Sequence, residues 1–171
     1  VDGDVALVGA HFDREIGPQS GATYVFRRNG STWAQEAKLV DPDGAAYVRF
    51  GYSVDVLGDL AVVGATHDCD NGINFGSVHL FRFDGSASDP AWNEEAELYG
   101  SGSEINGNFG FSVSVGDEVV AVGAQNAGRT GDGWSDGEGA VHVFEKNGLD
   151  WVETEKLVAS DGGGSDHLGE S

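Results

Sequence analysis

One unit of roughly 55–60 residues occurs three times in succession, and this internal repeat constrains the fold more than any other feature of the sequence. The stretch 50–54 reads FGYSV and returns at 109–113 as FGFSV. A repeat of this length is one supersecondary unit that must stack on its neighbours to bury its apolar face. Two further landmarks keep fixed places in each copy: the glycine of a Val-Gly-Ala triplet (Gly9, Gly64, Gly123) and a tryptophan (Trp33, Trp92, Trp151).

The copies account for nearly the whole sequence, so we expect residues 1–171 to form a single domain. The approximate repeats are 1–49, 50–108 and 109–167. Residues 168–171 read LGES and open a further copy.

The second copy shows the pattern of a four-stranded sheet most clearly. Residues 52–56 and 76–83 alternate between apolar and polar positions, 60–65 form a short apolar run, and 92–99 begin with an aromatic residue. The turn at 57–59 is too short for anything except a hairpin, which makes the strands around it antiparallel. Because no useful run of residues follows the helical period, the sequence predicts an all-β chain.

A single four-stranded sheet cannot bury both of its faces, so the copies must stack on one another. Radial stacking of such sheets produces a β-propeller. The predicted fold is therefore an all-β propeller built from four-stranded antiparallel blades, with three blades' worth in this chain. Propellers have about four to eight blades, so three of them form an incomplete ring.

The ends of the sequence suggest what completes the ring. In repeat register Ser171 corresponds to Ser53, and Val1 corresponds to Val56, so both ends fall inside an innermost strand. Two arrangements remain open: further repeats of a longer chain, or copies of this chain associated head to tail. Either way, we expect more repeats of the same kind to be partners of this segment.

Several landmarks are expected to have structural roles. The tryptophan that opens each fourth strand should pack between adjacent blades, and the glycine of each triplet should stand where a neighbouring backbone or ring comes close. The residues assigned to this structural set are Phe50, Gly51, Gly64, Phe109, Gly110, Gly123, Trp33, Trp92 and Trp151.

The order of these motifs resembles the FG-GAP repeat family, which is known from integrin α-subunit propellers and from bacterial and archaeal surface proteins. Each copy combines Phe-Gly-x-Ser-Val, Val-Gly-Ala, a later Gly-x-x-x-x-Phe and a tryptophan. The resemblance covers essentially the whole chain. It implies the propeller fold and a surface location, but a fold shared by many proteins does not specify a function.

One part of the integrin-like pattern is missing. In that form the hairpin between the first two strands carries a calcium loop rich in aspartate. The corresponding turns here are 2–4 (DGD), 57–59 (LGD) and 116–118 (GDE), and none has the alternating acids needed to surround calcium with six or more oxygens. We therefore do not expect calcium at these hairpins.

The chain is strongly acidic, with 29 acidic residues, nine Lys and Arg residues and a net charge of −20. This charge argues against nucleic acids and anionic membranes as partners, because both are polyanions. It favours cations, although the acidity is equally explained by solubility. No apolar stretch is long enough to insert into a membrane.

Antiparallel order places the longest loops on one face of the propeller. These are the loops between the second and third strands of each copy, together with the links from one copy to the next. Both kinds are rich in acids and vary between copies, and binding sites in repeat folds commonly occupy such a face. The segments are 11–20, 41–49, 66–75, 100–108, 125–137 and 160–166.

Two of these loops are candidate metal sites, and calcium is the expected ion. Asp68, Asp70 and Asn71 resemble the start of a calcium loop, although no distal bidentate glutamate follows. A second candidate set is Asp132, Asp136 and Glu138. For each set the alternative is a plain acidic turn.

Two further positions are candidate sites of other kinds. Trp134 lies outside the repeat pattern and is a candidate for stacking on a sugar or a cation, or else anchors its own loop. Asn29 begins an Asn-x-Ser sequon in a predicted hairpin turn, which makes it a glycosylation site if the protein is secreted in a eukaryote.

No catalytic constellation is recognisable in the sequence, because serine, histidine and acidic residues form no nucleophile elbow and no histidine pair has zinc spacing. We therefore expect a non-enzymatic module, extracellular or at the cell surface, that binds protein or carbohydrate and serves adhesion through its acidic long-loop face. Two alternatives remain open: a structural repeat of a surface layer, appendage or filament, and a propeller enzyme acting on polysaccharide.

Overall fold

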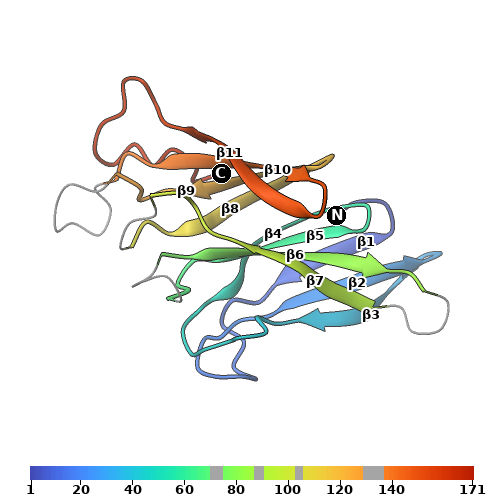
Figure 1. Ribbon diagram of the computed structural model, residues 1–171. Helices are drawn as coiled ribbons and strands as arrows, with labels where there is room; N and C mark the ends of the chain where they lie inside the picture. The colour runs from blue at the N-terminus through green and yellow to red at the C-terminus, as the bar shows by residue number, and fades with distance from the viewer. Residues whose placement is uncertain (70–74, 87–90, 103–105, 129–136) are drawn as a thin grey trace.

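The computed structural model describes residues 1–69, 75–86, 91–102, 106–128 and 137–171, and Figure 1 shows the chain as a ribbon. Within these residues there are eleven strands in three antiparallel sheets and no helix. Consecutive strands pair in order within each sheet, and the sheets lie on one another without closing into a ring. The predicted all-β, incomplete propeller is confirmed.

We call the three sheets blade 1, blade 2 and blade 3. Blade 1 has three strands: β1 (Val5–Gly9), β2 (Thr23–Asn29) and β3 (Thr32–Leu39). Blade 2 has four: β4 (Phe50–Leu57), β5 (Leu60–Ala65), β6 (Ser77–Asp84) and β7 (Ala91–Leu98). Blade 3 has four: β8 (Phe109–Gly116), β9 (Val119–Ala124), β10 (Ala140–Asn147) and β11 (Asp150–Leu157).

Two hydrophobic cores hold the blades together, one on each side of blade 2. The short apolar strand β5 supplies both, because successive side chains of a strand point to opposite faces. Val63 belongs to the core shared with blade 1, and Val62 to the core shared with blade 3. Both side chains are fully buried, which explains why β5 is an apolar run rather than an alternating strand.

The Phe-Gly-x-Ser motif forms a bulge at the start of each innermost strand. Phe50 pairs with Ala65, but the next pair is Ser53 with Gly64, so two residues of β4 are left out of the ladder. One of them is Gly51, whose φ of 81° lies in the left-handed region that favours glycine. β4 therefore begins two residues before the strand predicted at 52–56, since Phe50 still pairs with β5 beyond the bulge.

The repeated glycines and serines meet between blades. A Cβ atom added at Gly64 would lie 2.2 Å from the carbonyl oxygen of Gly110 in blade 3, so no side chain fits there. The hydroxyl of Ser53 donates a hydrogen bond of 2.7 Å to the same carbonyl. Ser112 makes the equivalent bond to the carbonyl of Gly169, at 2.9 Å. The Val-Gly-Ala and Phe-Gly-x-Ser-Val motifs of one blade thus contact the Phe-Gly-x-Ser-Val motif of the next.

The tryptophans join adjacent blades at the outer strands. The indole N–H of Trp92 donates to Glu36 of blade 1 at 2.8 Å, and that of Trp151 donates to Glu95 of blade 2 at 2.9 Å. Both rings also pack against the cores between their blades. Trp33, in blade 1, is 43% exposed and lies beneath the guanidinium of its own blade's Arg28.

Candidate functional site

The long loops gather at one end of the sheets, to the left in Figure 1. We call this end the long-loop face. Neighbouring loops are hydrogen-bonded to one another: Tyr47 N–H donates to the carbonyl of Pro18 at 2.8 Å, and Ser165 N–H to that of Gly137 at 3.1 Å. The face is made of the described parts of segments 10–22, 40–49, 66–76, 99–108, 125–139 and 158–168.

Most of the metal-binding and stacking residues proposed from the sequence lie outside the described residues. Asp68 is described from the first set, and Glu138 from the second. The residues outside are Asp70, Asn71, Asp132, Trp134 and Asp136. The two proposed calcium loops therefore stay predictions.

Asp68 is buried rather than displayed on an open loop, being only 4% exposed. Its backbone N–H donates to the carbonyl of Ala65 at the end of β5, and its carbonyl accepts from Gly76 at the start of β6. These two bonds close the base of the loop. They hold the Asp68 side chain beneath the long-loop face, against strands β6 and β7.

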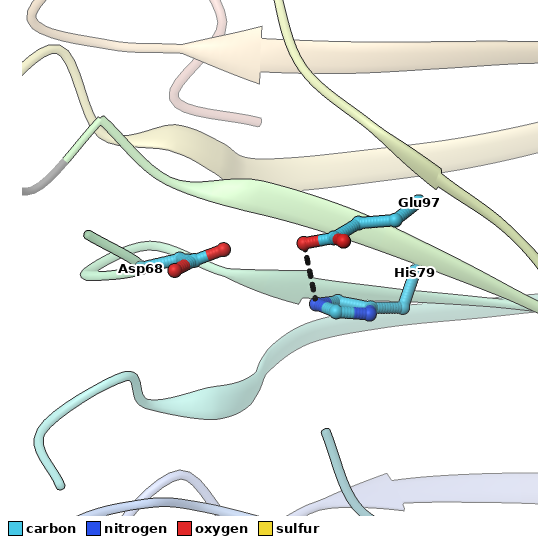
Figure 2. Close-up of side chains that lie close together, drawn as sticks. All are labelled: Asp68, His79 and Glu97. Atoms are coloured by element: carbon cyan, nitrogen blue, oxygen red, sulfur yellow. Dashed lines mark ion pairs between the residues drawn. The ribbon is translucent and has the colours of Figure 1, made fainter. Parts of the chain in front are cut away.

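Asp68, His79 and Glu97 form the clearest cluster of metal-ligand groups (Figure 2). His79 on β6 lies opposite Glu97 on β7 in the antiparallel register, so their side chains share one face of the blade. One oxygen from each carboxylate and one imidazole nitrogen all lie within 4.8 Å of one another. Within the described part of the chain, no other three His, Cys, Asp or Glu residues meet this criterion.

His79 is held by contacts to both of its ring nitrogens. Nδ1 lies 2.8 Å from a carboxylate oxygen of Glu94, and Nε2 lies 3.0 Å from the hydroxyl of Ser77. Nε2 also faces Glu97, whose oxygen is 3.7 Å away. Burial opposes protonation of this ring, but the bond to Glu94 and the charges of Asp41 and Glu97 prevail and raise the pKa of His79.

The pKa of Glu97 is raised as well. Burial raises the pKa of Glu97, and the charges of Asp68 and Asp41 raise it further. The hydroxyl of Tyr99 donates to Glu97 at 2.6 Å and lowers that pKa, as does the charge of His79, without restoring the ordinary value. The carboxylates therefore crowd one another in a place with little water.

The sequence interpretation assigned Asp68 to a metal site but gave it different companions. It named neither His79 nor Glu97 as a ligand. The signal that could have found Glu97 is a break in the repeat: the residue before the repeated leucine is lysine in the other two copies, at Lys38 and Lys156, but glutamate here. Strand register then places Glu97 beside His79.

A second feature of the long-loop face is a group of exposed apolar side chains in the loops of blade 1. Phe12 is 58% exposed, Ile16 47% and Tyr47 57%. They project from loops 10–22 and 40–49, which the bond from Tyr47 to Pro18 ties together. The guanidinium of Arg49 lies 5.9 Å from the centre of the Phe12 ring. This group combines apolar surface with a cation on an otherwise acidic chain.

The predicted sequon lies away from this face. Asn29 is the last residue of β2, is exposed, and stands in the hairpin turn to β3 with Gly30 at a φ of 63°. Its side chain is thus on the surface at the opposite end of blade 1. Glycosylation of Asn29 stays a prediction.

Stacked four-stranded sheets with these bulges define a β-propeller module. The family model for the FG-GAP repeat matches residues 33–81 and 92–144, so the chain belongs to the FG-GAP repeat family, as its motifs indicated. No curated protein matches the sequence. Among the described residues there is also no helix of the length and apolar character needed to cross a membrane.

Proposed function

We propose that this chain is a non-catalytic propeller module that binds a protein or carbohydrate ligand through its long-loop face, outside the cell or at the cell surface. The observation that carries the proposal is the exposed group of Phe12, Ile16 and Tyr47 on that face. Large apolar side chains that remain exposed together on a soluble protein are typical of interaction sites.

The position of this group suits a binding site. Its loops are anchored on the rigid strands of blade 1, and surface loops on a fixed scaffold are where repeat proteins commonly bind partners. Phenylalanine and tyrosine are enriched at the centres of protein interfaces, and aromatic rings also stack on sugars. The acidic surroundings favour a ligand with cationic character.

The extracellular location rests on the family. FG-GAP repeats typically occur in extracellular or surface proteins, which supports a role in adhesion. The strong acidity and the lack of a recognisable catalytic constellation in the sequence agree with a binding role.

The proposal is tested by screening the purified chain against arrays of glycans and of purified extracellular proteins, followed by surface plasmon resonance on any hit. We expect Phe12→Ala with Tyr47→Ala to weaken binding by about 2 kcal/mol or more, roughly 30-fold, because interface aromatics contribute amounts of this size. Leu149→Ala is the matched control, since Leu149 is 92% exposed in the β10–β11 turn at the opposite end.

Two results would contradict the proposal. One is a ligand whose affinity falls equally with the control variant and with the double variant. The other is turnover of an arrayed polysaccharide by the chain, which would favour the enzyme alternative.

A further inference from the structure

The three blades differ in the charge they place at one repeated position beneath the long-loop face. In blade 1 the position of Asp68 is occupied by Asp13, since both donate their N–H to an alanine and both accept from a glycine. Strand register pairs Tyr24 with Lys38 in blade 1 as it pairs His79 with Glu97 in blade 2. The two sites can therefore be compared residue by residue.

Blade 1 contains its own cation. The ammonium of Lys38 lies 3.0 Å from a carboxylate oxygen of Asp13 and also contacts Glu15. The hydroxyl of Tyr24 donates to the same Asp13 oxygen at 2.9 Å. The buried side of the carboxylate is thus neutralised by a positive charge and a hydrogen-bond donor.

Blade 3 contains a lysine at this position and lacks the aspartate. Its equivalent residues are Ala127, His142 and Lys156. His142 Nδ1 lies 2.9 Å from Glu153, as His79 lies beside Glu94. Burial, supported by the charge of Lys156, lowers the pKa of His142 despite Glu153. The two histidines share a strand position and a glutamate partner, yet their surroundings have opposite charge.

Blade 2 replaces the lysine by Glu97 and retains the aspartate. Asp41 is 7% exposed, and its charge raises the pKa values of both His79 and Glu97, so it adds a further carboxylate nearby. A buried carboxylate is costly unless a positive charge lies beside it. Where blade 1 has an ammonium, blade 2 therefore has a place for a cation from outside the chain.

We propose that Asp68, His79 and Glu97 bind a divalent transition-metal ion of the zinc class, which takes the place that the Lys38 ammonium holds in blade 1. This proposal does not depend on the ligand proposed for the long-loop face. Of the residues in the two calcium loops expected from the sequence, only Asp68 belongs to this site.

The ligand set favours zinc over calcium. Zinc binds imidazole nitrogen and carboxylate oxygen in tetrahedral sites, whereas calcium takes six to eight oxygens. His79 has the arrangement found around zinc-binding histidines, in which one ring nitrogen donates to a carboxylate and the other binds the metal. Here Nδ1 faces Glu94, and Nε2 faces Glu97.

The site needs only local adjustment to receive the ion. Ligand atoms around tetrahedral zinc are about 3.3 Å apart, and those of the cluster already lie within 4.8 Å. The Ser77 hydroxyl would give up its contact with Nε2. Glu97 keeps 27% of its side chain exposed, which provides a route for the ion from solvent.

The test is isothermal titration of zinc chloride into the full chain after chelator treatment, at neutral pH and in a Cys69→Ser background. That background removes an exposed thiol next to Asp68 as a competing ligand. We expect a single ion to bind per chain. Calcium added in excess should not displace the bound zinc, because the site offers an imidazole nitrogen and few oxygens.

The variants copy residues that other blades already carry, so they should fold. Asp68→Ala reproduces Ala127, and Glu97→Lys reproduces Lys38 and Lys156. Each should abolish zinc binding, while Glu94→Gln, which removes the negative charge of the partner of Nδ1, should weaken it by about 10–100-fold. Asp161→Asn, an exposed acid elsewhere on the long-loop face, should leave it unchanged.

Circular dichroism and thermal unfolding of the metal-free variants establish that they are folded. Because Glu97→Lys supplies an internal cation, the metal-free variant should also unfold at a higher temperature than the metal-free native chain. Failure of the native chain to bind zinc, or undiminished binding by folded Glu97→Lys, would overturn the proposal.

Discussion

Glu36 connects two side chains, one from blade 1 and one from blade 2. Its carboxylate accepts from the guanidinium of Arg27 on the neighbouring strand and from the indole of Trp92 in blade 2. The bond from Arg27 lowers the pKa of Glu36, and the bond from Trp92 acts in the same direction, together outweighing the effect of burial. The ionised form of Glu36 therefore stabilises the contact between blades 1 and 2.

We expect Glu36→Gln to lower the free energy of unfolding by about 1–3 kcal/mol at neutral pH, the usual cost of losing a hydrogen-bonded charge. The effect should depend on pH. Because the folded pKa of Glu36 is depressed, its contribution is complete above the unfolded value, near 4.5, and is lost as the pH falls below it. Urea unfolding at several pH values measures both effects.

Glu155→Gln is the control for this prediction, since Glu155 is exposed on β11. Its free energy of unfolding should stay within about 0.5 kcal/mol of the native value. If the difference between Glu36→Gln and the native chain were the same at low and neutral pH, Glu36 would not act through its charge.

The sequence contained more information about residue 97 than its local pattern suggested. Asp68 could be selected as a metal ligand because acids cluster around it in the chain. Glu97 lies far from that loop in sequence and looks like an ordinary polar residue of a strand. Its relation to His79 depends on cross-strand register, which becomes visible only after the repeats are aligned and the β6–β7 hairpin is paired.

At the level of strands, the spacing between blades depends on the repeated glycine near the end of β1, β5 and β9. Gly9, Gly64 and Gly123 each lie against the carbonyl of a glycine in the following bulge. At Gly64 the distance from a built Cβ to the Gly110 oxygen is 2.2 Å, and the obstructing atom belongs to the backbone, which cannot rotate away. The blades would have to separate to admit a methyl group.

We therefore expect Gly64→Ala to destabilise the fold by about 1–3 kcal/mol, as overpacked core substitutions do. Gly116→Ala is the control, since Gly116 is also a strand glycine, at the end of β8. Its Cβ would meet nothing closer than 3.8 Å. Equal melting temperatures for the two variants in differential scanning calorimetry would show that close packing at Gly64 does not limit the distance between blades.

The elements themselves were largely predictable from the sequence, whereas their exact starts were not. Alternation and short turns located the strands of the second copy, and the apolar run at 60–65 became β5 without change. The bulge after Phe50 was not foreseen, because alternation stops at Gly51 and the pairing of Phe50 with Ala65 depends on a left-handed glycine. The local alternation of apolar and polar residues cannot reveal that two strands continue to pair beyond a bulge.

At the scale of the whole molecule, three stacked blades leave the outer surfaces of blades 1 and 3 uncovered by a further sheet. Apolar side chains remain on these sheets: Val8 on β1 is 50% exposed, and Val152 and Leu157 on β11 are also exposed. Further repeats, from a longer chain or from another copy, are the partners that would cover them in the same way that blades cover one another here.

We expect the chain by itself to associate as its concentration rises, because those surfaces and the outer strand edges are available to other copies. Sedimentation velocity over a range of micromolar concentrations measures this association. Val8→Ser with Val152→Ser should reduce it, whereas Leu149→Ser, in a turn, should not. A chain that stays monomeric throughout the range would contradict the need for covering repeats.

The central claim is that blade 2 binds a metal ion in the place where blade 1 has the ammonium of Lys38. Locating the ion in a crystal tests this claim most directly. Crystals grown with zinc chloride, measured on both sides of the zinc absorption edge, should give one anomalous peak in blade 2. It should lie about 2 Å from Nε2 of His79 and from carboxylate oxygens of Asp68 and Glu97. The equivalent place beside Lys38 should be empty of zinc. A map without a peak at His79, in crystals where zinc binds elsewhere on the surface, would contradict the proposed site.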